Sequence, residues 1–378
     1  MRKFLLREIF TDNILPEIET VGFDKSYAGQ ACCKFEYKNI KIYSLSPAQA
    51  NIIKQTAISV GADCATHREV ITGKIETSDC ILGGSLSQIK KIAEKLKYQP
   101  FGLKYLGESL VEFVSRKKNV KTKIMGVLNL TDNSFSDGGK YLEFEKAIEH
   151  LKELIDDGAD IIDIGAESTK PYSKPVSSQI QLKRIIPILE YVCDNDIQIP
   201  ISVDTRSSEV AKEAIRHGAK IINDVSGMDF DENMADVVAK GGVKIVIQHS
   251  KGTPENMQEN PSYENLMDEI FCDLKMKVDF AILKGILAEN IILDPGIGFG
   301  KTREDNFEII KRVEEFYSLG CPVLLGVSRK SLLNMRNEDN FMKDIFTVAL
   351  NNLAIERKVD IIRVHNVKLH RQLIEMMS

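Results

Sequence analysis

From residue 122 to the C-terminus, short apolar and β-branched runs alternate with longer amphipathic segments. Segments such as 144–159 and 208–219 have helical spacing and close on a glycine, as helix C-termini do. Nearly continuous apolar strands that alternate with helices predict a parallel sheet buried on both faces. The eight predicted strands are 123–130, 160–165, 199–204, 220–224, 243–249, 291–296, 322–328 and 360–365.

The number of strand–helix units decides between two α/β architectures. Eight units over residues 122–378 match the length of about 250 residues that is typical of a (β/α)8 barrel. A doubly wound open sheet is the alternative. We favour the TIM barrel because there are eight units and because polar residues follow every strand, where barrel enzymes carry their active sites.

Residues 1–118 follow a different pattern. Residues 49–62 have helical spacing, residues 80–98 predict a short strand that runs into a helix, and residues 32–45 alternate as a strand does. This region is therefore predicted to be a small α/β domain of unknown role. The charged stretch 114–123 is predicted to bridge it to the barrel.

Composition narrows the function classes. With 43% hydrophobic and 28% charged residues and a net charge of -5, the chain has the make-up of a soluble globular protein and lacks a basic surface for nucleic acid. Its seven cysteines lack C-x-x-C spacing, which favours reduced thiols in a cytoplasmic protein. Arg7 and Glu8 interrupt the N-terminal apolar run, so it makes a poor signal peptide, and no stretch approaches the roughly 18 apolar residues of a membrane span.

Charged and thiol groups also occur in the N-terminal region. His67, Arg68 and Glu69 are consecutive and are interpreted as a solvated turn rather than a site, because exposed charges are common. The adjacent Cys32 and Cys33 are interpreted as packing residues. We therefore assign this domain no catalytic role and expect it to stabilise the protein or to bind a partner.

Polar side chains follow each predicted barrel strand. A single Asp or Asn after a strand is most often a helix cap or turn residue, and the Gly-rich segment 294–301 alone is weak evidence for phosphate binding. In a barrel, however, all eight strand ends converge on one face and line one pocket. The residues concerned are Asn129, Asp163, Glu167, Asp204, Asn223, Asp224, Gln248, His249, Asp294, Ser328, Arg329, Lys330, Arg363 and His365.

The charges of these residues indicate a ligand with two chemically different ends. Carboxylates after the third, fourth and sixth strands suit a ligand with several N–H donors, because an ionised carboxylate only accepts hydrogen bonds. Arg363, His365 and Asn129 become neighbours when the barrel closes, and their side chains favour an anion. Ser328 and Lys330 lie between the two ends. Asn129 is also a candidate magnesium ligand, because hard cations prefer oxygen and usually bring phosphate with them.

Seven motifs at the strand ends together resemble dihydropteroate synthase, in the order of that family and over residues 122–378. The resemblance implies a transferase of folate biosynthesis with a pterin-binding TIM barrel and Mg2+ as cofactor, and it suggests a homodimer. Such an enzyme condenses 6-hydroxymethyl-7,8-dihydropterin diphosphate with p-aminobenzoate to give 7,8-dihydropteroate and pyrophosphate. The motifs are MGVLNLTDNSFSDGG (125–139), DIGAESTKP (163–171), SVDT (202–205), INDVSG (222–227), LDPGIGFGK (293–301), GVSRKS (326–331) and RVHNV (363–367).

The resemblance also implies a role for individual residues at the matching positions. The residues implied to bind the pterin are Asp204, Asn223, Asp294 and Lys330. Those implied to bind the diphosphate are Asn129, which also holds Mg2+, Thr169, Arg363 and His365. Those implied to seat p-aminobenzoate are Phe135, Lys170, Phe299 and Ser328. The residues expected to be catalytic are Lys330, Asp204, Arg363, His365 and Asp137, in a dissociative, SN1-like substitution.

The sequence departs from the usual family pattern at five positions. Asp132 and Asn133 stand where a Pro-Asp pair is usual, and the lost proline removes a fixed φ from the first loop. Lys170 replaces a common arginine and keeps the charge without the planar fork. Ala166 and Ser250 replace a common glycine and a common methionine. None of these changes removes a pterin or diphosphate ligand, and the resemblance predicts competitive inhibition by sulfonamides, which mimic p-aminobenzoate.

Two other functions compete with the synthase. A methyltetrahydrofolate-binding methyltransferase module would share the pterin carboxylates, but it has no need for the loop motifs or for the Arg363 and His365 pair. A non-catalytic binding protein derived from a synthase would have lost ligand positions as readily as loop positions. Here only loop residues and one wall residue differ, so we favour the enzyme.

Overall fold

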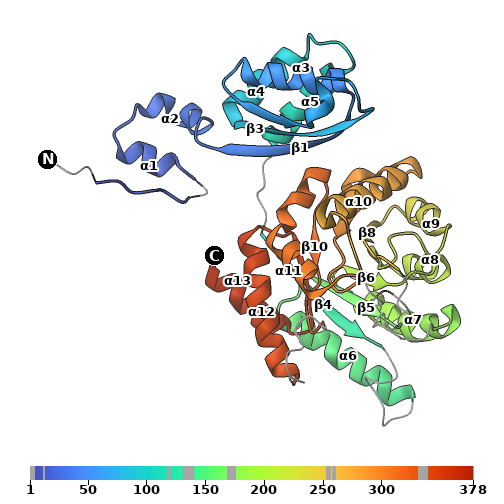
Figure 1. Cartoon of the computed structure of the whole chain (residues 1–378). Helices are drawn as coiled ribbons and strands as arrows, with labels where there is room; N and C mark the ends of the chain where they lie inside the picture. Colours follow the sequence, from blue (N-terminus) through green and yellow to red (C-terminus); the bar gives the residue numbers. More distant parts are fainter. Residues whose placement is uncertain are drawn as a thin grey trace. The chain divides into compact units, whose positions relative to one another are not determined.

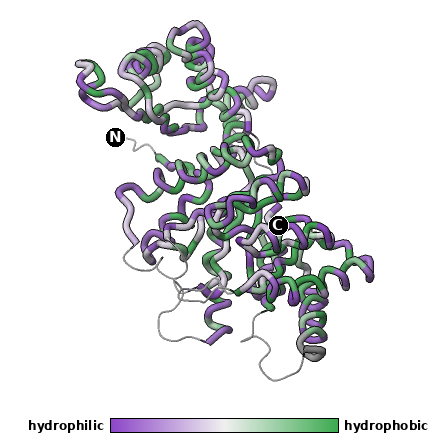
Figure 2. Tube along the Cα trace, turned by 90° about the vertical axis from the view of Figure 1, so that its right-hand side faces the viewer, coloured by the Kyte–Doolittle hydropathy of each residue, from purple (hydrophilic) through white to green (hydrophobic). Residues whose placement is uncertain are grey.

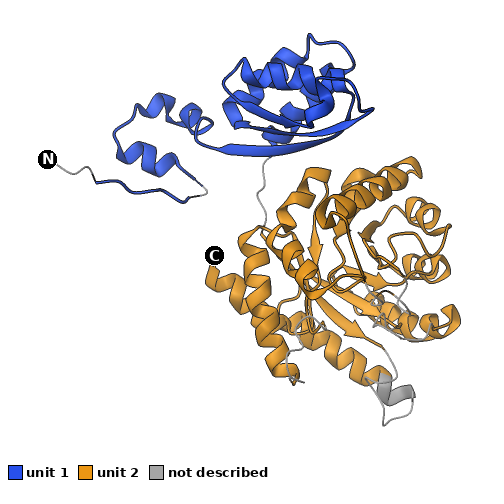
Figure 3. Cartoon of the chain, viewed as in Figure 1, with its two compact units in different colours: residues 1–118 blue, residues 119–378 orange. Residues whose placement is uncertain are grey.

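The computed structural model describes residues 5–11, 13–116, 121–130, 140–167, 176–252, 257, 261–330 and 339–377. Two compact units make up the chain, residues 1–118 (unit 1) and residues 119–378 (unit 2) (Figure 3). Among the described residues, no helix combines the length and the apolar composition that crossing a membrane requires.

Unit 1 is a small α/β structure with a three-stranded antiparallel sheet in the order β1-β3-β2. Its elements are α1 (Leu15–Thr20), α2 (Lys25–Cys32), β1 (Tyr37–Leu45), α3 (Pro47–Ile58), β2 (Asp63–Thr66), β3 (Ser78–Ser85), α4 (Leu86–Leu96) and α5 (Leu103–Ser115). The predicted helix at 49–62, the strand–helix pair at 80–98 and the strand in 32–45 are confirmed.

Local sequence explains where the helices of unit 1 begin. Ser46 caps α3 and Ser85 caps α4, each through a capping box completed by the glutamine three residues later. The buried side of α4 carries Ile89, Ile92 and Leu96, which join the core of the unit. His67 accepts a hydrogen bond from Glu69 N (3.2 Å) and caps a short 3-10 turn, which agrees with the interpretation of this segment as a charged turn.

Unit 2 is a closed barrel of eight parallel strands. The hydrogen-bonded order is β10-β11-β4-β5-β6-β7-β8-β9, and a parallel bridge between Leu293 and Val323 joins the two ends. The TIM barrel prediction is therefore confirmed and the open sheet is wrong. The strands are β4 (Lys123–Asn129), β5 (Ile161–Gly165), β6 (Ile201–Asp204), β7 (Ile221–Asp224), β8 (Lys244–Gln248), β9 (Ile291–Asp294), β10 (Leu324–Leu325) and β11 (Ile361–Val364).

The strand β10 is shorter than the predicted range 322–328. Pro322 has no N–H to donate to a neighbouring strand, although its carbonyl accepts from Leu293 N at 2.8 Å. At the other end the backbone turns out of the strand, and Arg329 adopts a left-handed conformation with φ 56°. Only Leu324 and Leu325 therefore pair in regular register with β11.

A helix follows each barrel strand and covers the outside of the sheet (Figure 1). Along the tube of Figure 2, the helices alternate hydrophobic and hydrophilic stretches, as expected for helices with one face on the barrel. The helices are α6 (Lys140–Asp156), α7 (Ser178–Asp194), α8 (Ser208–Arg216), α9 (Met234–Gly241), α10 (Leu266–Leu283), α11 (Arg303–Lys311), α12 (Asn340–Glu356) and α13 (Val367–Met377).

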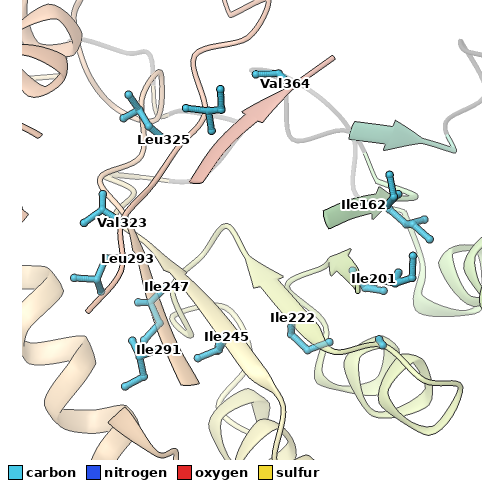
Figure 4. Close-up of a cluster of buried hydrophobic side chains, with 14 of the residues drawn as sticks. Ile162, Ile201, Ile222, Ile245, Ile247, Ile291, Leu293, Val323, Leu325 and Val364 are labelled. Atoms are coloured by element: carbon cyan, nitrogen blue, oxygen red, sulfur yellow. The ribbon is translucent and has the colours of Figure 1, made fainter. Parts of the chain in front are cut away.

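Alternate residues of the barrel strands serve two different cores. One set, including Ile162, Ile222 and Leu293, lies in the large core between strands and helices (Figure 4). The other set lies in a separate apolar cluster on the opposite face of the strands, inside the barrel. We call this cluster the lower layer; its members are Met125, Ile161, Ile221, Val246, Ile292, Leu324 and Ile361.

Candidate active site

Polar residues form a second ring inside the barrel, two positions beyond the lower layer. Because strand side chains alternate, the residue two places after Ile161 or Ile292 faces the same interior, one step nearer the carboxyl ends of the strands. Strand register places Asp204, which ends β6, opposite Asn223, and Gln248 opposite Asp294. We call this ring the upper layer; its members are Asp163, Asp204, Asn223, Gln248, Asp294 and Arg363.

Arg363 donates hydrogen bonds to two carboxylates of the upper layer. Its Nε donates to Asp163 Oδ2 at 2.6 Å, and its Nη2 donates to Asp204 Oδ2 at 2.9 Å. Asn223 Nδ2 donates to the same Asp163 oxygen at 3.0 Å. The guanidinium therefore faces the carboxylates of β5 and β6, and it keeps further N–H donors for a ligand.

Burial shifts the acid–base properties of the upper-layer carboxylates. It raises the pKa of Asp204 to about 7, although the positive charge of Arg363 acts in the opposite direction. Burial also raises the pKa of Asp294, against the charge of Lys330 and a hydrogen bond from Gly296 N to Asp294 Oδ1 (2.7 Å). For Arg363, burial lowers the pKa but Asp163 and Asp204 outweigh it, so the pKa is raised and the side chain stays charged.

Lys330 places a cation beside an aromatic ring at the rim of the upper layer. Its Nζ lies 4.5 Å from the centroid of the Phe299 ring and donates to the carbonyl of Ile297. Burial lowers its pKa to about 8, with Asp294 acting in the opposite direction. Phe299 is buried and packs with Val225 and Met257, so loops that follow four different strands meet at this ring.

Hydrogen bonds join the loops that follow β10 and β11. Ser328 Oγ and His365 Nδ1 are 2.9 Å apart, and His365 N donates to the same hydroxyl at 3.2 Å. Next to them, Arg329 donates to both carboxylate oxygens of Asp344 on α12, at 2.7 and 2.8 Å. Arg329 is therefore directed into this ion pair, whereas Ser328 and His365 lie together at the end of the barrel.

Asn129 is the last residue of β4 and pairs with Gly165 of β5, which has no side chain. A Cβ placed on Gly165 would lie 3.6 Å from Asn129 Oδ1 and 3.7 Å from Asp204 Oδ2, so the glycine leaves room between these oxygens. The described residues contain no group of three His, Cys, Asp or Glu side chains able to hold a metal. The Asn129 amide oxygen is the kind of donor that a hard cation such as Mg2+ prefers.

Three strand-end residues from the sequence survey have a local structural role. Asp224 accepts from Ser226 N, Ser226 Oγ and Met228 N, so it shapes the turn after β7, as the simple turn interpretation predicts. Gln248 Nε2 donates to Val225 O at 3.1 Å. Glu167 pairs with Arg206 at 3.2 Å and accepts from Val176 N. The expectation that a carboxylate after the fourth strand is available to a ligand is wrong for Asp224.

Several predicted residues lie outside the described part of the chain. These are Phe135 and Asp137, and the departures Asp132 and Asn133, in segment 131–139, together with Thr169 and Lys170 in segment 168–175. The other predicted residues come together at the carboxyl ends of the strands, in the contacts given above.

Two buried groups were assigned to no ligand in the sequence prediction. Asp163 is fully buried, and its Oδ1, like Ser202 Oγ on the next strand, has no hydrogen-bond partner among the described residues. Lys301 is 2% exposed and bonds to His249. The position of Asp163 two residues after Ile161 is a signal that points inward. For Lys301 the sequence carries no such signal, because it follows a Gly-rich turn.

Sequence comparison identifies known relatives. The family model for pterin binding enzymes matches residues 125–365. The dihydropteroate synthase of Bacillus subtilis is 44% identical over 262 residues, which cover 68% of this chain and 88% of that protein. A Helicobacter pylori protein named as a bifunctional dihydropteroate synthase/dihydropteroate reductase is 34% identical over 328 residues, covering 86% of this chain and 85% of that protein.

A longer archaeal relative matches as well. The probable bifunctional folylpolyglutamate synthase/dihydropteroate synthase of Haloferax volcanii is 33% identical over 343 residues. The match covers 84% of this chain but only 40% of that protein. The chain therefore spans less than half of this relative.

Solved structures share the barrel. The dihydropteroate synthase of Clostridium difficile, determined in the presence of pteroic acid, has a TM-score of 0.63 and 40% identity and covers 68% of this chain and 95% of that one. The Yersinia pestis enzyme, in a sulfonamide drug complex, has a TM-score of 0.64 and 33% identity, with 68% and 93% covered.

Proposed function

The chain belongs to the dihydropteroate synthase family of pterin-binding enzymes, and from that membership we propose the reaction and the residue roles of its barrel. The reaction joins 6-hydroxymethyl-7,8-dihydropterin diphosphate to p-aminobenzoate and releases pyrophosphate. The observation that carries the proposal is that the buried carboxylates of Asp204 and Asp294 and the amide of Asn223 lie in the upper layer, with the Lys330 ammonium at its rim.

The pterin is assigned to the upper layer. A reduced pterin offers several N–H donors along one edge, and Asp204 and Asp294 supply acceptors in a buried setting. Asn223 both donates and accepts, and the Lys330 ammonium donates to the ring carbonyl. Burial raises the pKa of both carboxyl groups and so favours their neutral form. Hydrogen bonds from the ligand act in the opposite direction and favour the ionised form on binding.

The diphosphate is assigned to Asn129, Arg363, His365 and Thr169. Arg363 already touches Asp204 and has further donors, so it can join the pterin end of the site to the phosphate end. The His365 ring is held by the contact between its Nδ1 and the Ser328 hydroxyl. Asn129 would hold Mg2+, which supplies positive charge to the phosphate oxygens when it is bound.

We propose a dissociative substitution. The bond between the methylene carbon and the diphosphate oxygen breaks, and its electron pair leaves with pyrophosphate, whose charge Arg363 and His365 stabilise. The positive charge left on the methylene and the ring is stabilised by Asp204 and Asp294. The amine nitrogen of p-aminobenzoate then gives its lone pair to the methylene carbon and loses a proton to solvent water. Lack of positional isotope scrambling in the diphosphate without p-aminobenzoate would count against this order of events.

The second substrate is assigned to the rim. Phe299 offers the face of a ring next to the Lys330 cation, and Ser328 offers a hydroxyl next to His365, which suits an aromatic amine with a carboxylate. Phe135 and Lys170 are assigned to the same substrate on the family pattern. Competitive inhibition by sulfonamides follows from this assignment.

We further propose a cytoplasmic homodimer. The described cysteines are all free, as is usual for reducing compartments. The exposed side of α12 carries the apolar side chains Phe341, Met342, Ile345 and Leu353, which recur at helical spacing. Sedimentation equilibrium of the full chain would distinguish a dimer from a monomer.

A second activity is a candidate for unit 1. The match to the Helicobacter pylori protein covers more of this chain than the barrel unit accounts for, so it extends into unit 1. Reduction of dihydropteroate requires a hydride donor from outside the chain. Incubation of the full chain with 7,8-dihydropteroate and reduced nicotinamide, with and without flavin, tests for tetrahydropteroate by mass spectrometry; its absence would leave unit 1 without this role.

The synthase proposal is tested with the purified full chain. We expect 7,8-dihydropteroate when the pterin diphosphate, p-aminobenzoate and Mg2+ are all present, and none when either substrate is omitted. A protein that binds the pterin but forms no product would favour the methyltransferase module or the non-catalytic binding protein instead.

A further inference from the structure

Lys301 is a buried lysine whose three donors all have acceptors. It follows the Gly-rich turn after β9 and is 2% exposed. Its Nζ lies 2.8 Å from His249 Nδ1, 3.0 Å from Phe299 O and 3.4 Å from His249 O. An ammonium only donates, so His249 accepts through Nδ1 and carries its proton on Nε2. Burial and then the charge of Lys301 lower the pKa of His249 to about 2, which keeps the ring neutral.

The ammonium joins two loops whose backbones are in direct contact. A Cβ on Gly296 would lie 1.9 Å from His249 O, and a Cβ on Gly300 would lie 2.2 Å from Lys251 O. Both glycines have positive φ, so other residues would be strained there as well. The loop after β9 can therefore approach the loop after β8 only with glycine at these positions, and Lys301 supplies polar contacts across the junction.

The same junction supports the rim of the active site. Phe299 O accepts from Lys301, and the Phe299 ring lies under the Lys330 ammonium at 4.5 Å. Burial lowers the pKa of Lys301 to about 7, yet three acceptors favour its charged form. Burial of a charged group is unfavourable unless the group is paired, and the hydrogen bond to Phe299 O is one of the contacts that offset this cost.

We propose that Lys301 is a positioning residue that, through His249 and the Phe299 carbonyl, holds the Phe299 ring where p-aminobenzoate binds. Lys301 does not touch substrate itself. The inference rests on the proposed synthase function and adds a determinant of affinity for the second substrate.

The structure offers a matched control in a second buried lysine. Lys277 on α10 is 7% exposed, and its Nζ contacts Asp229 at 2.6 Å and Ser226 O at 3.3 Å. Among the residues that the structure describes, it makes no hydrogen bond to Phe299 or to His249. Loss of either lysine removes a buried, hydrogen-bonded cation, so both variants carry a comparable folding cost.

The experiment compares the steady-state kinetics and pterin binding of four variants in the full chain. We expect Lys301→Met to raise the KM for p-aminobenzoate about ten-fold or more, the scale of one charged hydrogen bond. The Kd for the pterin diphosphate should change far less. His249→Asn keeps an acceptor near the position of Nδ1 and should behave as wild type, whereas His249→Leu should raise the KM. Lys277→Met should leave the KM unchanged while lowering the melting temperature.

A double variant tests whether Lys301 acts through the ring. If it does, Lys301→Met combined with Phe299→Leu raises the KM no further than Phe299→Leu alone. Additive effects, an unchanged KM in Lys301→Met, or an equal rise in Lys277→Met would overturn the proposal. Should Lys301→Met fail to fold, His249→Leu with and without Phe299→Leu replaces it in the cycle. Absence of dihydropteroate from the wild type would instead refute the synthase function.

Discussion

On β5, β7, β8, β9 and β11 a residue of the lower layer and a residue of the upper layer lie two positions apart, yet their side chains differ in polarity and charge. The lower layer consists of seven buried apolar side chains. The upper layer holds three carboxylates and an arginine, and burial raises the pKa of Asp204 to about 7. Burying charge in this way opposes folding, whereas burying isoleucine favours it. The contrast fits the proposal above, in which the lower layer stabilises the barrel and the upper layer binds the substrate.

The largest expected effect comes from the upper layer and from Lys330 at its rim. Asp204→Ala and Lys330→Ala should each abolish measurable turnover, because they remove groups that stabilise developing charge, each worth about 10²–10³ in rate. Steady-state assays of dihydropteroate formation give the rate, and thermal melts should show both variants to be folded. An Asp204→Ala protein that turns over at the wild-type rate would refute the assignment of the pterin site.

The lower layer should respond in the opposite way. Met125 is fully buried and lies four residues before Asn129 on β4. Met125→Ala should lower the free energy of unfolding by about 2–5 kcal/mol, through lost burial and the cavity that remains. Denaturant unfolding measures this loss, while turnover per folded molecule should stay near wild type. A stable Met125→Ala protein without activity would show that the two layers are not separable.

Titration with pH sharpens the contrast further. The pKa of Asp204 is raised to about 7 and that of Lys330 lowered to about 8, and substrate binding needs the carboxylate and the ammonium. We therefore expect kcat/KM to be bell-shaped, falling below about pH 7 and above about pH 8, with apparent values that belong to the coupled set of groups. The acid limb should disappear or move in Asp204→Asn; an unchanged limb would assign it to another group.

The contribution of Asp204 to the free energy of unfolding should decrease as pH rises toward 7, while kcat/KM increases. Because the folded-state pKa of Asp204 lies above its ordinary value of 3.8, its contribution to stability is present below that value. The contribution is lost as pH rises through about 7, where activity increases. Unfolding free energies of wild type and Asp204→Asn between pH 4 and 8 measure the difference.

The smallest expected effect concerns a loop position outside the upper layer. Lys170→Arg restores the residue that is common in the family and keeps the charge, so most of the turnover should remain. Parallel inhibition curves with a sulfonamide would show whether the planar fork alters the affinity for the p-aminobenzoate site. A large loss of turnover would mean that the local geometry requires lysine.

Strand periodicity allowed much of the barrel to be predicted from sequence. Eight β-branched runs predicted the positions of the strands. Once a barrel was assumed, the polar residue two places after Ile161, Ile221 or Ile292 could be assigned to its inner face. The pattern did not predict which polar side chain at a strand end hydrogen-bonds to the backbone of its own turn. Asp224 and Asp204 both end a strand, yet only Asp224 accepts three hydrogen bonds from its own turn.

The sequence also did not predict which side chains far apart along the chain contact one another. The sequence predicted an anion site at Arg363, His365 and Asn129, because the last and the first strand become neighbours when the barrel closes. The structure directs Arg363 to Asp163 and Asp204, and His365 to Ser328. Lys301 and His249 are 52 residues apart, and their contact depends on two glycines that let the loops touch. Neither pairing is encoded in local spacing.

Binding of the pterin diphosphate to three proteins, measured by isothermal titration calorimetry, tests the division between the layers most directly. The proteins are the wild type, Asp204→Ala and Met125→Ala, all held at a temperature where each is folded. We predict that Asp204→Ala melts near the wild type but shows no binding heat, while Met125→Ala melts earlier and binds as the wild type does. Binding retained in Asp204→Ala and lost in folded Met125→Ala would contradict the assignment of chemistry to the upper layer and stability to the lower one.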